Sequence, residues 1–146
     1  MEGNLEARRR AAVATIFDDV ATQMVERVVV EAVRASNFFG LTGDRAEGYG
    51  RSIRATLPPA LDALTEPDSA ERDRKLEGVA ASVRQISVDH HVPIIIERGL
   101  VSVAFGLVRT LVRQRAAASG FTADELDAEL RAFQNEFEEK LFRSAP

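Results

Sequence analysis

The chain has two histidines, His90 and His91, which are adjacent and stand just before Pro93 and three isoleucines. Histidine ligates metals and haem iron and transfers protons near neutral pH. Neighbouring residues on a helix point about 100° apart, so this pair does not converge on one metal ion. No glutamate stands at the spacing of three that di-iron helices use. We therefore expect no zinc or di-iron site here, and the two histidines have to be considered separately.

Other residue patterns that could support catalysis are incomplete. The chain has no cysteine, which excludes disulfides and thiolate chemistry. The acidic pairs at 18–19 and 138–139 fall on polar helix faces, and the "GYG" at 48–50 lacks the third glycine and the preceding strand of a dinucleotide site. Ser87 lies near the histidines, but no orienting acid is evident. The sequence therefore predicts a protein that is not an enzyme.

The elements that must position the histidines are helices. The chain has 146 residues, 45% apolar and 29% charged, which is typical of one globular domain, here residues 1–146. Apolar residues recur with a period of 3.6, and few stretches alternate as strands do. The fold class predicted is all-α, a single domain of about six helices. Their expected ranges are about 5–35, 44–55, a short helix after 56, 69–90, 94–115 and 123–141.

Capping signals define several helix ends. Asp68 with Glu71, and Thr122 with Glu125, have the spacing of capping boxes. Thr56 is expected to cap a short helix that begins with Pro58 and Pro59, with a break near Leu57.

Helical spacing gives the two histidines different environments. His90 continues the apolar series Val83 and Ile86 at steps of three and four, whereas His91 should face outward. The helix at 94–115 is apolar nearly all round, which is typical of a central or interface helix, so we expect a homodimer. The residues predicted to be buried are Ile86, Phe105, Val108, Leu130 and Phe137.

From Leu76 to Leu141 the chain resembles a globin. The segment "VRQISVDHH" is similar to the end of a globin F helix, and "FTADELDAELRAFQNEFEEKLF" is similar to the GH turn and H helix. The resemblance implies a globin-like fold in which His90 would be the proximal ligand of a haem iron. The other residues that it would place at a haem are Phe38, Phe39, Tyr49, Ile86 and Phe105.

A second resemblance points to a haem-free form. The segments "SIRATLPPALDAL" and "HVPIIIERGLVSVAFGLVRTLV" are similar to the N-terminal domains of RsbR/RsbRD-type stressosome proteins and PucR-type regulators. The RsbR-type domain implies a globin-like sensor that binds no haem and dimerises. Pro58 and Pro59 would also interrupt a distal helix, and Pro93 follows His90 closely. Both resemblances place the chain in the globin superfamily.

Two functions follow as alternatives. The first is a haem-free sensor domain in signal transduction or stress response, which transmits a signal by binding a ligand or a regulatory protein. The second is a haem globin that binds or senses a gas through His90. The net charge of −4 argues against a nucleic-acid partner, and Arg8–Arg10 should be a solvated helix start. The longest apolar run, 99–108, is about half of a membrane span. We therefore expect a cytoplasmic protein.

Overall fold

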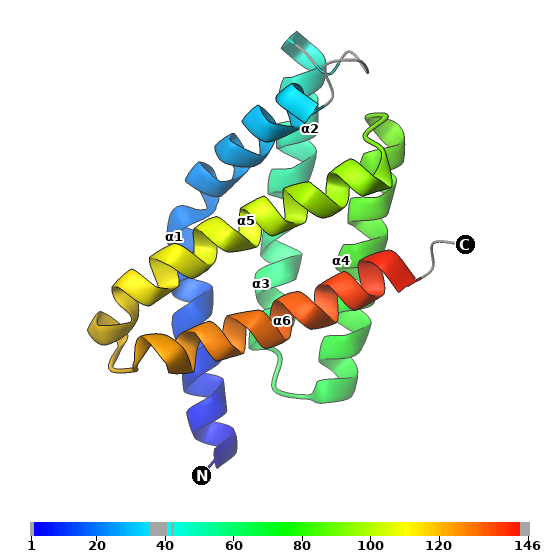
Figure 1. The fold of residues 1–146 in the computed structure, drawn as a ribbon. Coiled ribbons are helices and arrows are strands. Elements are labelled where there is room, and N and C mark those ends of the chain that lie inside the picture. Colours follow the sequence, from blue (N-terminus) through cyan, green and yellow to red (C-terminus); the bar gives the residue numbers. More distant parts are fainter. Residues whose placement is uncertain (1, 36–40, 42, 144–146) are drawn as a thin grey trace.

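A computed structural model describes residues 2–35, 41 and 43–143, and in these ranges the chain is all helix and connecting turns (Figure 1). This confirms the predicted all-α class. The α-helices and one short 3-10 helix in the described part are α1 (Glu2–Ala35), α2 (Gly43–Ala55), α3 (Leu57–Thr65), α4 (Ser69–Asp89), α5 (Ile94–Arg115), η1 (Ala116–Ser119) and α6 (Ala123–Arg143).

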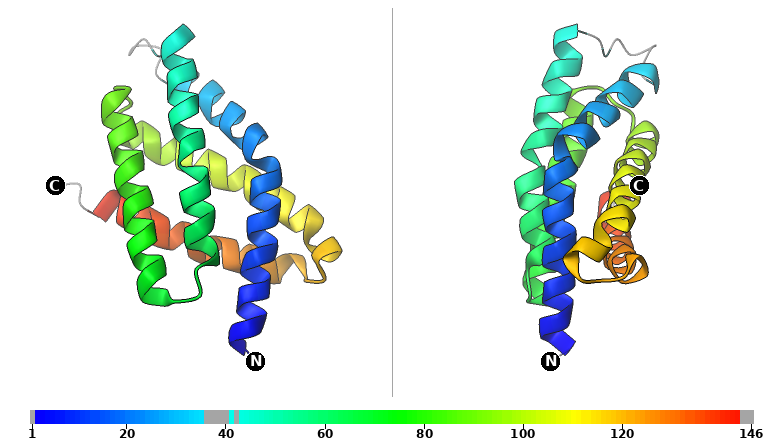
Figure 2. Two further views of the ribbon diagram at one scale, coloured as in Figure 1. Left: turned by 180° about the vertical axis from the view of Figure 1, so that it is seen from behind. Right: turned by 90° about the vertical axis from the view of Figure 1, so that its left-hand side faces the viewer.

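The helices form two layers. Figure 2 shows α1, the α2–α3 pair and α4 in one layer, with α5 and α6 running across them in the other. Helix α5 packs on α1 and α6, and α6 also packs on α4 and α1. Because the layers cross, α5 and α6 each touch both α1 and α4 of the other layer. The resulting core is one continuous cluster that extends from Val13 on α1 to Leu141 on α6.

An aromatic group fills the middle of this core. Phe105 of α5 packs edge-on against Phe17 of α1, with ring centroids 6.1 Å apart, and lies 6.2 Å from Phe137 of α6. Phe105, Val108, Leu130 and Phe137 are all buried, as the sequence predicts. The prediction for Ile86 is wrong: its side chain is half-buried, because it faces the open side of α4 and only its inner edge reaches the core.

The α2–α3 pair is one kinked rod. Thr56 alone separates the two helices, and Pro58 and Pro59 stand in the first turn of α3, where missing N–H groups are tolerated. The break is where the sequence predicts it, but Thr56 does not cap α3. Its backbone is helical, and its hydroxyl donates backwards to the Ile53 carbonyl oxygen at 2.6 Å. Because the hydroxyl is turned back toward α2, it makes no capping hydrogen bond to the N–H groups of α3.

The capping boxes form as expected. The Asp68 carboxylate accepts from the Glu71 backbone N–H at 3.0 Å. Thr122 and Glu125 bond reciprocally, each backbone N–H donating to the other side chain at 3.1 Å. These bonds begin α4 and α6 at the predicted residues.

The basic run near the N-terminus has a different environment from the one predicted. Instead of being solvated, Arg9 and Arg10 both reach Glu129 of α6, at 3.2 and 3.4 Å, and the Arg8 guanidinium lies over the Phe121 ring. The run therefore joins α1 to the start of α6.

Truncating Phe137 to Ala should lower the free energy of unfolding by about 3–5 kcal/mol, because the ring fills the centre of the core. Urea denaturation followed by circular dichroism measures the loss. Asn135→Ala, at an exposed position of the same helix, is the control and should change stability by less than about 0.5 kcal/mol. Similar small changes for both variants would contradict the placement of Phe137.

Candidate functional site

The two histidines have separate roles at the end of α4. His90 is the C-cap, and His91 follows with a positive φ of 57°. The His91 N–H donates to the Val88 carbonyl oxygen at 3.2 Å, and the Val92 N–H donates to Ser87 at 2.9 Å. This is the Schellman arrangement, in which the left-handed residue is usually glycine. His91 therefore ends the helix and is exposed, as predicted.

The His90 side chain turns back toward α2. Its Nε2 atom lies 3.2 Å from the Ser52 hydroxyl, and its ring packs edge-on against the Tyr49 ring, with centroids 5.7 Å apart. His90 is half-buried, at the edge of the apolar stripe and not within it. The Nε2 atom and one side of the ring are thus in contact with α2.

Tyr49 is fully buried, on a part of α2 that lies close to α1. A Cβ atom at the neighbouring Gly50 would lie 3.0 Å from a Val29 methyl group, so Gly50 lets the two helices pack closely. The Tyr49 hydroxyl donates to the Glu97 carboxylate, at 2.9 and 3.1 Å from its two oxygens. Glu97, in the first turn of α5, is itself only 2% exposed. This hydrogen bond joins the two layers through the interior.

Glu97 is short of hydrogen-bond donors. A carboxylate has about four acceptor positions, and Tyr49 supplies one proton. Ser87 of α4 is the other donor within reach, but its hydroxyl also lies 3.2 Å from the Val83 carbonyl oxygen. Among the described residues, no lysine or arginine side chain is paired with Glu97. Burial therefore raises the pKa of the Glu97 carboxyl, although the bonds from Tyr49 and Ser87 oppose the shift.

The same environment keeps Tyr49 protonated. Burial, together with the adjacent Glu97 carboxylate, raises the pKa of Tyr49 far above its ordinary value. Tyr49 therefore keeps its proton and serves as a hydrogen-bond donor to Glu97.

An apolar cavity of about 80 Å³ lies beside Glu97, between the two layers. Every α-helix of the described chain contributes to its wall. The polar side chains among its described lining residues are those of Glu97 and Thr56. The apolar lining includes Phe17, Ile53, Val83, Leu100, Phe105 and Phe137.

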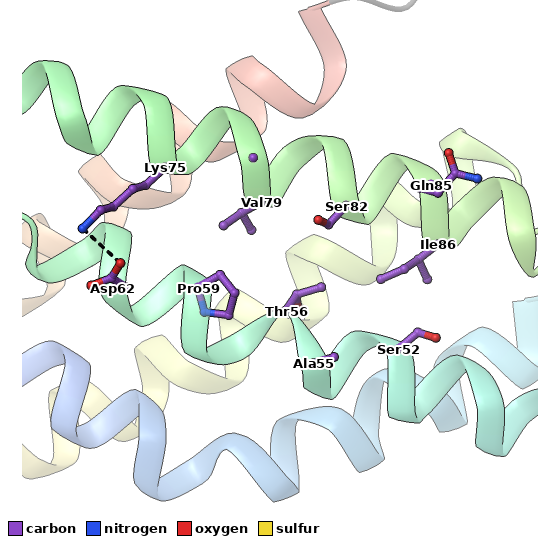
Figure 3. A pocket seen from close by; sticks show the side chains of 11 residues that line it. Ser52, Ala55, Thr56, Pro59, Asp62, Lys75, Val79, Ser82, Gln85 and Ile86 are labelled. Carbon is purple, nitrogen blue, oxygen red and sulfur yellow. Dashed lines mark ion pairs between the residues drawn. The ribbon is translucent and has the colours of Figure 1, made fainter.

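A larger open groove of about 650 Å³ lies on the outer side of this cavity, between α4 and the α2–α3 rod (Figure 3). Figure 3 shows Thr56, Pro59 and Val79 facing each other across it, with the Lys75–Asp62 ion pair, 3.0 Å, at one end. Thr56 and Val79 line both the groove and the cavity. These two side chains therefore lie between the groove and the cavity.

The structure brings together only some of the residues that the globin resemblance places around a haem. A haem iron would bind His90 Nε2, but that atom faces Ser52, and Tyr49 lies directly against the ring. The His90 ring packs on Tyr49 of α2, and the described lining of the central cavity of about 80 Å³ does not include His90. Ile86 lines the outer groove and Phe105 the cavity, so they do not face one ligand with His90. Phe38 and Phe39 lie outside the described residues.

Sequence reasoning missed Glu97, which is the buried acid of the site. The signal was present: Glu97, Val101, Phe105, Val108 and Val112 recur at steps of three and four on one face of α5, and all are buried. A carboxylate on an otherwise apolar helical stripe indicates a buried polar group. Acidic residues are also common in the first turn of a helix, where they are usually exposed to solvent. This makes the burial of Glu97 hard to recognise from the sequence.

Comparison of the chain with family models, with curated proteins and with solved structures finds no match in any of the three. Within residues 2–35, 41 and 43–143, no helix is both long and apolar enough to cross a bilayer. The same residues contain no group of three histidine or acidic side chains placed to hold a metal ion. The Tyr49–Glu97 pair and the cavity beside it are the features of the described residues that bear on function.

The raised pKa of Glu97 predicts how stability depends on pH. The folded state holds this proton more tightly than the unfolded chain does, so Glu97 favours folding most below the ordinary carboxyl pKa. Its contribution should fall as the pH rises through the folded-state pKa. Glu97→Gln removes the titration and should gain stability relative to the wild type as the pH increases.

Urea denaturation of both proteins from pH 4.5 to pH 9 (roughly spanning the titration range of a raised carboxyl pKa) measures this difference. Lys140 and Arg109 lower the pKa values of Asp73 and Asp127, respectively, and such groups make stability rise with pH. Both proteins contain these groups, so their contributions cancel in the comparison. A difference between wild type and variant that stays constant with pH would show that Glu97 does not titrate in this range.

Proposed function

We propose that the chain is a haem-free, globin-like sensor domain without enzymatic activity, which acts in the cytoplasm as a homodimer. It transmits a signal by binding a small ligand or a regulatory protein. The observation that carries this proposal is the contact of Tyr49 and Ser52 with His90, which occupies the face of the histidine that a haem would need. The apolar cavity beside Glu97 supplies a place for a ligand of a different kind.

The order of elements supports the globin-like assignment. Helix α4 ends at a histidine, the apolar α5 follows after Pro93, and a Thr-capped α6 closes the chain. This is the order on which the resemblance to globins and to RsbR-type domains rests. The absence of a nucleophile, paired carboxylates or a metal cluster around the described cavity favours binding over catalysis.

Haem reconstitution tests the proposal directly. Purified protein mixed with haemin should show no stoichiometric Soret band. His90→Ala should lower the free energy of unfolding by about 1–2 kcal/mol, because it removes the contacts with Ser52 and Tyr49. His91→Ala is the matched control and should have a smaller effect, since His91 is exposed. A Soret band that His90→Ala abolishes and His91→Ala retains would establish the alternative, a haem globin.

Exposed apolar side chains support the homodimer. Val88 is 67% exposed and Ile95 is 77% exposed, and with Ile94 they surround the turn between α4 and α5. Apolar residues gathered at one corner favour an interface. We therefore place the dimer contact at this corner and the adjoining face of α5.

Light scattering at tens of micromolar protein should report a dimer. Ile95→Asp should shift the protein to a monomer, because a charge would be buried in the contact. Val30→Asp, an exposed apolar site on α1 away from the corner, should leave the dimer intact. A monomeric wild type would refute the dimer, and dissociation by Val30→Asp alone would refute its placement.

A further inference from the structure

When Glu97 is ionised, the polar groups that line the central cavity act as hydrogen-bond acceptors toward it. Thr56 donates its hydroxyl proton to the Ile53 carbonyl oxygen, so toward the cavity its oxygen can only accept. The Glu97 carboxylate accepts a hydrogen bond from the Tyr49 hydroxyl. It competes with the Val83 carbonyl oxygen for the hydrogen bond that the Ser87 hydroxyl donates. Buried acceptors of this kind are costly to leave unsatisfied. A complementary ligand must therefore bring hydrogen-bond donors.

Charge narrows the class of ligand further. An ionised carboxylate in an apolar interior is stable only when it is paired, and among the described residues no cation reaches Glu97. An ammonium group brings the missing charge and three donors, whereas a carboxylate ligand brings neither. The cavity thus favours a cation and disfavours an organic acid.

The volume and the lining of the cavity limit the rest of the ligand. The cavity holds about 80 Å³, and its wall apart from Glu97 and Thr56 is apolar. An apolar cavity of about 150 Å³ accepts benzene, which has six carbons, so by volume this one suits a branched alkyl group of roughly three carbons, such as the isopropyl end of isobutylamine. The outer groove, separated from the cavity by Thr56 and Val79, gives such a molecule a short path inward.

We propose that the central cavity binds a small primary amine with a short branched alkyl group, whose ammonium ion donates to Glu97 and to Thr56. The proposal rests on the proposed function, because it names the ligand class of the haem-free sensor. Glu97 ties α5 to α2 through Tyr49, so a ligand that pairs with Glu97 acts on the contact between the two layers.

Three molecules of nearly equal shape test the ligand class on the unaltered protein. Isothermal titration calorimetry at pH 7.5 is carried out with isobutylamine, isobutanol and isobutyrate (a pH at which roughly all of the amine is cationic and the acid anionic). Isobutylamine should bind about tenfold or more tightly than isobutanol, because it adds a charge-assisted hydrogen bond, and isobutyrate should not bind. Equal binding of the amine and the alcohol, or tighter binding of the acid, would overturn the proposal.

Two variants locate the site. Glu97→Gln should weaken isobutylamine binding by about tenfold or more while leaving isobutanol binding nearly unchanged. Asp62→Asn removes an acid from the outer groove and should leave amine binding as in the wild type. Circular dichroism verifies that both variants are folded. Amine binding that survives Glu97→Gln, or that is lost in Asp62→Asn, would place the amine elsewhere and overturn the proposal.

Haem uptake and isobutylamine binding together distinguish a wrong ligand class from a failure of the proposed function. If the protein takes up no haem and isobutylamine does not bind, the ligand class is wrong and the haem-free sensor stands. If the protein takes up a haem through His90, the proposed function fails, and with it the amine site, since a porphyrin would displace Tyr49 from Glu97.

Discussion

The hydrogen bond from Tyr49 to Glu97 is the constraint on which the arrangement around α2 depends. A carboxyl group that is 2% exposed in an apolar interior needs a donor, and Tyr49 is the donor that α2 supplies. To bring it there, α2 must lie close against α1, which Gly50 permits. The bond thus links the position of α2 to the first turn of α5, two elements that are far apart in the sequence.

The position of His90 follows from this contact. Because Tyr49 is held by Glu97, its ring is fixed where the His90 ring packs on it, and Ser52, one turn further along α2, reaches the histidine nitrogen. The histidine that resembles a proximal ligand is therefore part of the α2–α4 contact.

The two layers are held together differently at the centre and at the edges. At the centre, Phe105 meets aromatic rings from α1 and α6, and these large planar groups leave the small cavity beside Glu97. At the edges, buried charged groups are fully paired: Asp127 with Arg109 at 2.9 Å, and Lys140 with Asp73. Glu97 differs from these groups because its partner is a neutral hydroxyl. An acid paired in this way retains the capacity to bind a cation.

The sequence by itself determined the helices and most of their ends. Local signals carry this information: the capping boxes at Asp68 and Thr122, the prolines after Thr56, and the 3.6-residue period that buries Phe105 and Phe137. These depend on residues within one or two turns, so a reading of the sequence can find them.

The site was decided only by the tertiary structure. Glu97 and Tyr49 are 48 residues apart, and their bond exists because the packing of the two layers brings the first turn of α5 next to α2. Three other features also depend on how the helices pack together. The Thr56 hydroxyl donates to Ile53, Ile86 is only half-buried, and Arg9 and Arg10 both reach Glu129 of α6. Helical periodicity gives the direction of a side chain relative to its own axis, but not which neighbouring helix that side chain will meet.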